Sequence, residues 1–409
     1  MEKNYFAAIE FNGLSINILI LSYFCNSYNV IASSSTDCKG YENGEIIDYD
    51  AFNASLDNAL ENIKSKYKVT IDEIILVLPN NDHKVYSASL NNKILTERQI
   101  IGKAQVDAIR KQLRSAKVNE GEVLVDEVPT LYSLDNNRHL RSAPIGQRSS
   151  MLVIKSNIHT LPKRNIEPLY NILNEKGINV IGSSINCQCG VRALLNTLDL
   201  EKECIHININ GDTTTISAYH KNVLYKSKCL QFGVKTLISY LSNTLKLDFA
   251  TSKDLLESYL VCDIDLANDV IFDSELNLSE RRISGILLNR LNNAFNQILD
   301  ACNELITEFN FSDEHFILCS GYLNDYPCFI EELCRYSSLD IKSQDINVIG
   351  IDSQIFVNCY GAIVEFINKN PEFIKNKIEK DEQIEINSSN VDNNSNSTSR
   401  SRFVDIFDD

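Results

Sequence analysis

The alternation of apolar and polar positions divides the chain into short strands and longer helices. Near the N-terminus it predicts three successive antiparallel strands, at 5–10, 15–23 and 28–32. Apolar residues then recur with a helical period at 49–66, and a short apolar run at 73–78 predicts another strand. The first part of the chain therefore reads as three strands, a helix and a strand.

A second hairpin signal lies at the middle of the chain, in the run 204–219. Apolar and polar residues alternate up to Asn210-Gly211-Asp212, and β-branched and aromatic residues follow this turn. With a further strand at 223–229, the segment repeats the three-stranded pattern of the N-terminus. We interpret this repeat as a weak internal duplication.

The remaining elements divide the chain into two halves with an insertion in the first. The first half covers 1–82 and 162–203, the inserted unit 83–161, and the second half 204–370, of which 232–310 is mainly helical. The inserted unit is predicted as a strand, a helix and two strands. The predicted helices are 97–115, 162–176, 188–198, 233–245, 252–259, 279–308, 326–336 and 355–368, and the further strands are 84–90, 122–134, 149–156, 179–183 and 315–319.

The tail differs from the rest of the chain. Residues 371–401 are poor in apolar side chains, and we expect a disordered linker. The last eight residues, 402–409, form an amphipathic segment if helical, but their three aspartates would be repelled by anionic lipid. A membrane-surface helix, a disordered end and a peptide ligand for another protein all remain open. The candidate membrane-contacting residues are Phe403, Val404, Ile406 and Phe407.

Composition excludes several functions. The chain has 409 residues and a formal charge of -16, which argues against a nucleic-acid partner because such binding depends on Lys and Arg. Its twelve cysteines show no spacing typical of a metal site, so we expect buried, reduced thiols. No secretory signal is apparent at the N-terminus, and we expect a cytoplasmic protein.

Several segments resemble one family. Leu-Tyr-Ser-Leu-Asp at 131–135, Ala-Pro-Ile-Gly-Gln-Arg at 143–148 and Asn-Ile-Glu-Pro-Leu-Tyr at 165–170 are similar to the inserted subdomain and following helix of FtsA, the actin-like protein of bacterial cell division. The loop 39–48 and the closing helix around 360–362 are similar as well. The resemblance implies an α/β, actin-like two-domain fold with an FtsA-type strand-helix-strand-strand subdomain inserted in its first half.

The resemblance also implies a function. FtsA-like proteins polymerise head to tail, bind the C-terminal peptide of the tubulin-like FtsZ, and attach to the membrane through a C-terminal amphipathic helix. The implied partners are therefore FtsZ, further copies of the chain, the cytoplasmic membrane surface and other division proteins. The FtsZ-facing region would be the helical stretch 232–310.

The family's nucleotide motifs match this chain imperfectly. The first hairpin would place the Mg²⁺-organising carboxylate at Glu10 and the phosphate-facing residues at Asn12, Gly13 and Ser15, with Leu14 where the family has a hydroxyl. The second hairpin has Asn208 in place of an aspartate and Asp212 in place of a glycine. The implied nucleotide-binding residues are Asn12, Gly13, Ser15, Asn210, Gly211, Asp212, Thr213, Thr214, Ser320 and Gly321.

These departures bear on catalysis. Loss of a metal ligand and a carboxylate near the phosphates both oppose phosphoryl transfer, so we expect no efficient ATP hydrolysis. ATP and Mg²⁺ remain candidate ligands with weak binding, and hairpins that are only structural turns are an equal interpretation. The alternatives in function are an actin-like ATPase or small-molecule kinase, and a pilus-assembly adaptor of similar architecture.

Overall fold

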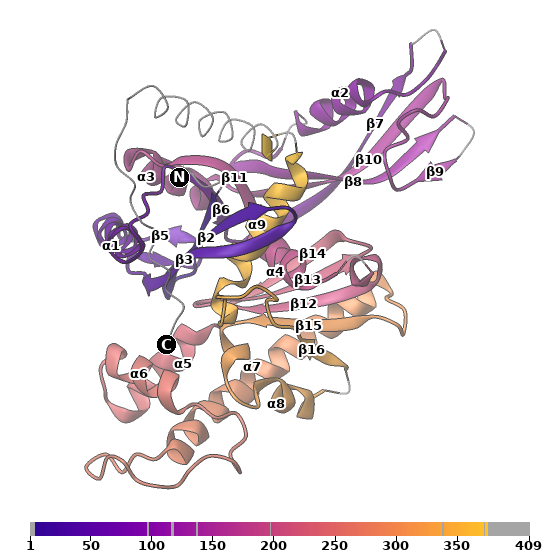
Figure 1. The fold of residues 1–409 in the computed structure, drawn as a ribbon. Helices are drawn as coiled ribbons and strands as arrows, with labels where there is room; N and C mark the ends of the chain where they lie inside the picture. Colours follow the sequence, from indigo (N-terminus) through magenta and orange to yellow (C-terminus); the bar gives the residue numbers. More distant parts are fainter. Residues whose placement is uncertain are drawn as a thin grey trace, which may run out of the picture.

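A computed structural model describes residues 5–95, 98–115, 118–135, 138–196, 198–337, 339–371 and 373–374. Two five-stranded sheets, each covered by helices, form the two halves, and a smaller sheet projects from the first half (Figure 1). Of the predicted linker 371–401, residues 371, 373 and 374 are described, and Ile374 is buried in the same core as α9 (Val357–Lys369). The rest of the linker and the candidate membrane-contacting residues Phe403, Val404, Ile406 and Phe407 lie outside the described residues.

The first sheet has the strand order β11-β6-β1-β2-β3. Its first three strands form the predicted antiparallel meander, and β6 and β11 add in parallel. The strands are β1 (Tyr5–Phe11), β2 (Ser15–Phe24), β3 (Ser27–Asp37), β6 (Glu73–Leu78) and β11 (Asn179–Ile185), with a small hairpin of β4 (Tyr41–Glu42) and β5 (Glu45–Ile46) and the helices α1 (Tyr49–Tyr67), α3 (Lys163–Glu175) and α4 (Asn186–Leu194).

The second sheet repeats this plan in the order β14-β13-β12-β15-β16. Again an antiparallel meander comes first and two parallel strands follow, which confirms the predicted repeat of the three-stranded unit. The strands are β12 (Glu203–Ile209), β13 (Thr214–His220), β14 (Val223–Leu230), β15 (Phe316–Gly321) and β16 (Ile341–Ser343), and the helices are α5 (Val234–Leu245), α6 (Phe249–Tyr259), α7 (Glu280–Phe309), α8 (Phe329–Arg335) and α9 (Val357–Lys369).

The inserted unit is a four-stranded sheet in the order β7-β10-β8-β9, with one helix packed on it. It extends away from both halves in Figure 1. Its elements are β7 (Lys84–Lys93), α2 (Lys103–Arg114), β8 (Glu122–Leu134), β9 (His139–Leu140) and β10 (Met151–Pro162).

Some predicted boundaries were wrong. The helix expected at 97–115 begins only at Lys103, because Ile100 forms a bridge to Arg148 and Ile101 is hydrogen-bonded to the Gln147 carbonyl. The strand expected to end at 156 continues to Pro162, which caps the following helix. Long-range strand pairing therefore outweighed the local helical period in this unit.

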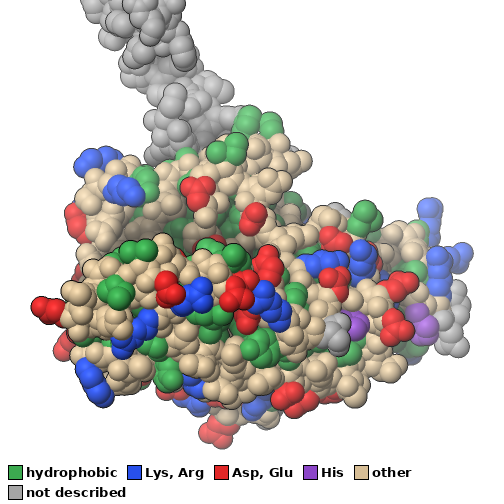
Figure 2. All heavy atoms as spheres, turned by 90° about the horizontal axis from the view of Figure 1, so that it is seen from below, with side chains coloured by type: hydrophobic (Ala, Val, Ile, Leu, Met, Phe, Trp, Pro, Cys, Tyr) green, Lys and Arg blue, Asp and Glu red, His purple; other side chains and the backbone are tan. Residues whose placement is uncertain are grey.

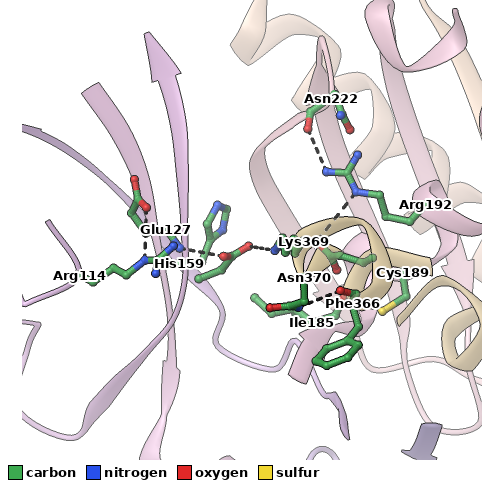
Figure 3. Close-up of polar contacts among 12 residues, drawn as sticks. Arg114, Glu127, His159, Ile185, Cys189, Arg192, Asn222, Phe366, Lys369 and Asn370 are labelled. Carbon is green, nitrogen blue, oxygen red and sulfur yellow. Dashed lines mark hydrogen bonds and ion pairs between the residues drawn. The ribbon is translucent and has the colours of Figure 1, made fainter. Parts of the chain in front are cut away.

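Helix α9 returns from the second half to the first sheet. Its side chains share a core with Phe6 and Ala8 of β1, and a Cβ at Gly361 would lie 1.9 Å from the Cys189 carbonyl oxygen of α4. At its end, the Lys369 ammonium binds the Asp126 carboxylate of the inserted sheet at 2.9 Å (Figure 3). The last described helix thus joins the first half to the inserted unit.

Candidate functional site

The turn between β1 and β2 is built by a short polar side chain. Asn12 Oδ1 accepts hydrogen bonds from the backbone N–H groups of Leu14 (3.2 Å) and Ser15 (2.9 Å). Gly13 has a φ of +78°, a conformation that favours glycine. Three of the predicted nucleotide-binding residues, Asn12, Gly13 and Ser15, are therefore held in one rigid turn.

The matching turn between β12 and β13 is fixed by the start of α5. The Asn210 carbonyl accepts from the N–H of Val234 at 3.2 Å, and the Gly211 carbonyl from that of Lys235 at 2.7 Å. The Thr214 hydroxyl donates to the Phe232 carbonyl at 2.8 Å. The backbone of this turn is therefore held by its own half.

The two turns touch each other. A Cβ added at Gly13 would lie 2.3 Å from Oδ2 of Asp212, and one at Gly211 would lie 2.5 Å from Oδ1 of Asn12. Asp212 also accepts a hydrogen bond from the Asn43 backbone at 2.7 Å, across the boundary between the halves. The two hairpins therefore meet, and their tips are in direct contact.

Leu14 crosses this boundary. It is only 6% exposed and packs in the hydrophobic core of the second half, whose other buried members all lie between Ile205 and Ile341. A residue of the first hairpin thus belongs to the core of the other domain. Burying a leucine side chain contributes about 1.5–3 kcal/mol, so this contact holds the two halves together.

Glu10 lies beneath the turns in a buried polar network. Its Oε1 accepts from the Asn358 amide of α9 at 2.6 Å, and the same amide group lies 3.2 Å from the Asn210 Oδ1. The Asn208 amide in turn donates to the Asn358 Oδ1 at 2.8 Å. Burial raises the pKa of Glu10 to about 7, and burial likewise raises the pKa of Asp212 to about 6.

The Ser320-Gly321 segment is followed by Tyr322, which contacts the first turn. Ser320 is buried and pairs with the His206 Nε2 at 2.8 Å, and Gly321 has a φ of +101°. The next residue, Tyr322, places its hydroxyl against the Ser15 hydroxyl and 3.2 Å from the Asn12 amide. Ser320 and Gly321, the remaining predicted nucleotide-binding residues, therefore lie next to a tyrosine that contacts the first turn.

A cleft of about 630 Å³ remains next to this cluster. It lies between the first hairpin and helix α6, and Lys253 of α6 reaches across it to the Asp37 carboxylate at 2.6 Å. Carboxylates of Glu257, Glu280 and Asp325 also line it. Three carboxylates therefore line the cleft, and its lysine already has a carboxylate partner.

The arrangement does not fit the triphosphate of ATP. The turns that would enclose phosphates are in contact, Leu14 stands where the family has a hydroxyl, and Asp212 carries a carboxyl group into the same place. Glu10, the predicted Mg²⁺ ligand, is engaged by an amide and has a raised pKa. We therefore derive no catalytic step through a nucleotide.

The chain shows only distant sequence similarity to known proteins. No protein-family model matches the chain. The cell division protein FtsA of Streptococcus pneumoniae is 20% identical over 304 residues, which cover 73% of this chain and 66% of that protein. FtsA of Rhizobium meliloti is 24% identical over 213 residues, 51% of this chain and 46% of that protein.

The chain is a distant homologue of FtsA. It spans about two thirds of the pneumococcal FtsA and less than half of the Rhizobium one. Among solved structures, a PilM-PilN type IV pilus biogenesis complex matches with a TM-score of 0.60 at 11% identity, covering 89% of this chain and 98% of that chain. The ethanolamine utilization protein EutJ of Carboxydothermus hydrogenoformans matches with a TM-score of 0.52 at 11% identity, over 89% of this chain and 90% of that one.

These likenesses confirm the predicted fold class. The fold is actin-like, with two related α/β halves. At 11% identity the structural likeness shows the fold alone. The alignments with FtsA show distant sequence similarity to this actin-like family.

Among the described residues, no group of three His, Cys, Asp or Glu side chains could hold a metal ion. No described helix is both long and apolar enough to cross a membrane.

Sequence reasoning missed three members of this site. Leu14, Tyr322 and Asn358 were not among the predicted site residues, although each contacts one or more of them. Leu14 was visible as an apolar residue inside a polar turn, and this mismatch was a usable signal. Tyr322 and Asn358 lie more than 300 positions from the first hairpin, and no local pattern indicates that contact.

Proposed function

We propose that this protein is a non-enzymatic adaptor that assembles FtsZ filaments and anchors them at the cytoplasmic face of the cell membrane, at the division site. The observation that carries the proposal is the alignment with FtsA over 304 residues. The closed arrangement of the hairpin turns supports the non-enzymatic part, because phosphoryl transfer needs space and positive charge around the phosphates.

The helical part of the second half offers a docking surface for FtsZ. The loop between α6 and α7 is the lowest feature in Figure 1. It carries several exposed apolar side chains. Phe272 of this loop stacks on Tyr259 with ring centroids 4.2 Å apart, which holds the loop against α6. We define the loop patch as Leu266, Val270, Ile271 and Phe272, which are 68%, 70%, 53% and 43% exposed.

The chemistry of the loop patch suits a short apolar peptide. On the face seen in Figure 2, apolar side chains lie among interspersed acidic and basic ones. A short peptide can bury a few apolar anchors against such a patch while polar groups at the rim remain solvated. We assign the loop patch to the C-terminal peptide of FtsZ.

Membrane attachment is the other half of the proposal. A single short helix with Phe403, Val404, Ile406 and Phe407 would bind lipid weakly, because short helices are marginal in water and its polar face is acidic. A head-to-tail polymer would present many such tails at once, and linked binding multiplies affinity without new contacts. Self-association is therefore part of the proposal, and other division proteins would join the same assembly.

Peptide binding tests the proposed interaction with FtsZ. Fluorescence anisotropy with a labelled FtsZ C-terminal peptide should detect binding by the full chain and a loss of at least about tenfold in the double variant Val270→Asp/Ile271→Asp. The matched control is Ile349→Asp, since Ile349 is 98% exposed and lies outside the loop patch. Absence of binding by the folded wild-type protein would overturn the proposal.

Localisation in cells tests the proposed membrane attachment. A fluorescent fusion should gather at midcell and lose membrane attachment when residues 403–409 are removed. Turnover of ATP with a small-molecule acceptor would instead favour the kinase alternative. Genomic proximity to pilus-assembly genes and not to an ftsZ-like gene would favour the pilus adaptor.

A further inference from the structure

We propose that the protein's own side chains occupy the place where the actin-like fold holds phosphates, and that this clasp keeps the two halves closed without any nucleotide. The clasp consists of Asn12, Leu14, Asp212 and Tyr322. The inference goes beyond the adaptor role, because it concerns how the halves are held and does not depend on FtsZ binding.

Side chains of each turn fill the space beside the glycine of the other. A single carbon added at Gly13 would lie 2.3 Å from Oδ2 of Asp212, and one added at Gly211 would lie 2.5 Å from Oδ1 of Asn12. A phosphate group is far larger than a methyl group. The hydroxyl of Tyr322 contacts the Ser15 hydroxyl and the Asn12 amide beside the first turn, between this turn and the cleft.

A second argument is the direction in which Leu14 points. The FtsA resemblance implies a hydroxyl at this position, whereas the leucine side chain is buried in the core of the second half. Opening the halves would expose this side chain to water, and a buried leucine favours the closed state by hydrophobic transfer. The buried Leu14 side chain therefore favours closure of the two halves without a ligand.

The charges around the two turns also disfavour the binding of phosphate. Asp212 adds a carboxyl group between the turns and is held by the Asn43 backbone N–H. The two lysines on this side of the second half are already paired with carboxylates of the first: Lys235 with Glu42 at 2.5 Å, and Lys253 with Asp37 at 2.6 Å. These cations link the halves to each other and are not free to neutralise phosphates.

The mechanical consequence follows from mass action. A ligand shifts an equilibrium between open and closed states only through its different affinity for the two. When intramolecular contacts already favour closure and fill the ligand's place, nucleotide cannot act as the switch. The closed form would then be the resting state at any nucleotide level.

Wild-type protein provides the first test. Thermal unfolding of the full chain with up to about 5 mM MgATP or MgADP should leave Tm unchanged within about 1 °C, since only ligands that bind the native state stabilise it. Hydrogen exchange should show the Asn43 amide equally protected with and without nucleotide. A rise of several degrees, or protection that appears only with nucleotide, would overturn the proposal.

Variants separate filled space from repulsive charge. Asp212→Asn keeps the shape and removes the charge, and we expect it still not to bind a fluorescent ATP analogue. Leu14→Ser/Asp212→Gly clears the space, and we expect a lower Tm without nucleotide and faster exchange at Asn43. Binding of the analogue by Asp212→Asn would contradict the proposal, because it would mean that charge alone keeps nucleotide out.

The double variant has a control against simple misfolding. Leu241→Ala removes a fully buried leucine from the same core without touching the turns. It should lower Tm while leaving Asn43 protection intact in the native state. Equal loss of Asn43 protection in both proteins would show that the clasp has no separate role, and this result would overturn the proposal.

Discussion

The Asn358 side-chain amide donates a 2.6 Å hydrogen bond to Oε1 of Glu10. It joins the last helix of the described chain to its first strand, beneath the two hairpin turns. The same side chain accepts from the Asn208 amide, so one residue links three elements in a buried network. The boundary between the halves is therefore fixed by hydrogen bonds as well as by Leu14.

Asn358→Ala should destabilise the protein by about 2–4 kcal/mol, because Glu10 and Asn208 would be left buried without this partner. Urea unfolding followed by circular dichroism measures the change. Asn293→Ala is the matched control, since Asn293 is exposed on α7 and should change stability by less than about 0.5 kcal/mol. An effect of Asn358→Ala as small as the control's would contradict the role of the network.

Glu10 should make stability depend on pH. Burial raises its pKa from 4.5 to about 7, so the folded state holds a proton that the unfolded state has released between these values. Its contribution to stability is therefore complete below about pH 4.5 and is lost as pH rises to about 7, by about 3 kcal/mol in total.

Comparison with Glu10→Gln isolates this component, because Asp212 and the buried histidines also titrate. The unfolding free energy of the variant minus that of wild type should increase between pH 5 and pH 8. A difference that stays constant across this range would contradict the raised pKa.

A buried histidine pair should act in the opposite direction. His83 and His159 stack with ring planes 3° apart and nitrogens at 3.1 Å, and His83 also pairs with Ser227 of the second half. Burial lowers the pKa of His83 to about 3 and that of His159 to about 4. Their contribution is present above pH 6.5 and is lost as pH falls below it.

His159→Phe keeps an aromatic ring and removes one titrating group. The loss of unfolding free energy between pH 7 and pH 5 should become smaller by about 2 kcal/mol in this variant, even if its stability is lower at both values. The same slope in wild type and His159→Phe would argue against the histidine pair as its source.

Gly361→Ala should prevent α9 from seating. The added methyl carbon would lie 1.9 Å from the Cys189 carbonyl oxygen, so the two helices would have to separate. We expect a loss of more than about 3 kcal/mol, or no soluble protein. Gly285→Ala within α7 is the contrasting variant, because the added carbon would lie 3.7 Å from Cδ1 of Ile264, an ordinary contact distance. Helix propensity then predicts a gain in stability of up to about 1 kcal/mol.

Local sequence pattern was sufficient for the elements that bury one face. The two meanders, helix α1 and the long helix α7 follow from apolar periods of two and 3.6 residues, and their predicted bounds agree with the structure within about one to five residues. The short strands β9 and β16 were not predicted, because each pairs over only two or three residues and lacks a pattern of its own.

The sequence by itself determined the repeated α/β plan, the position of the insertion and the residues at the tips of both hairpins. Only the tertiary structure decided that these tips touch, that Leu14 lies in the other domain's core, and that Asn358 and Tyr322 complete the site. The physical reason is range. Turn and strand preferences act over a few neighbouring residues, whereas the closure of the clasp depends on contacts between groups about 170 to 350 positions apart.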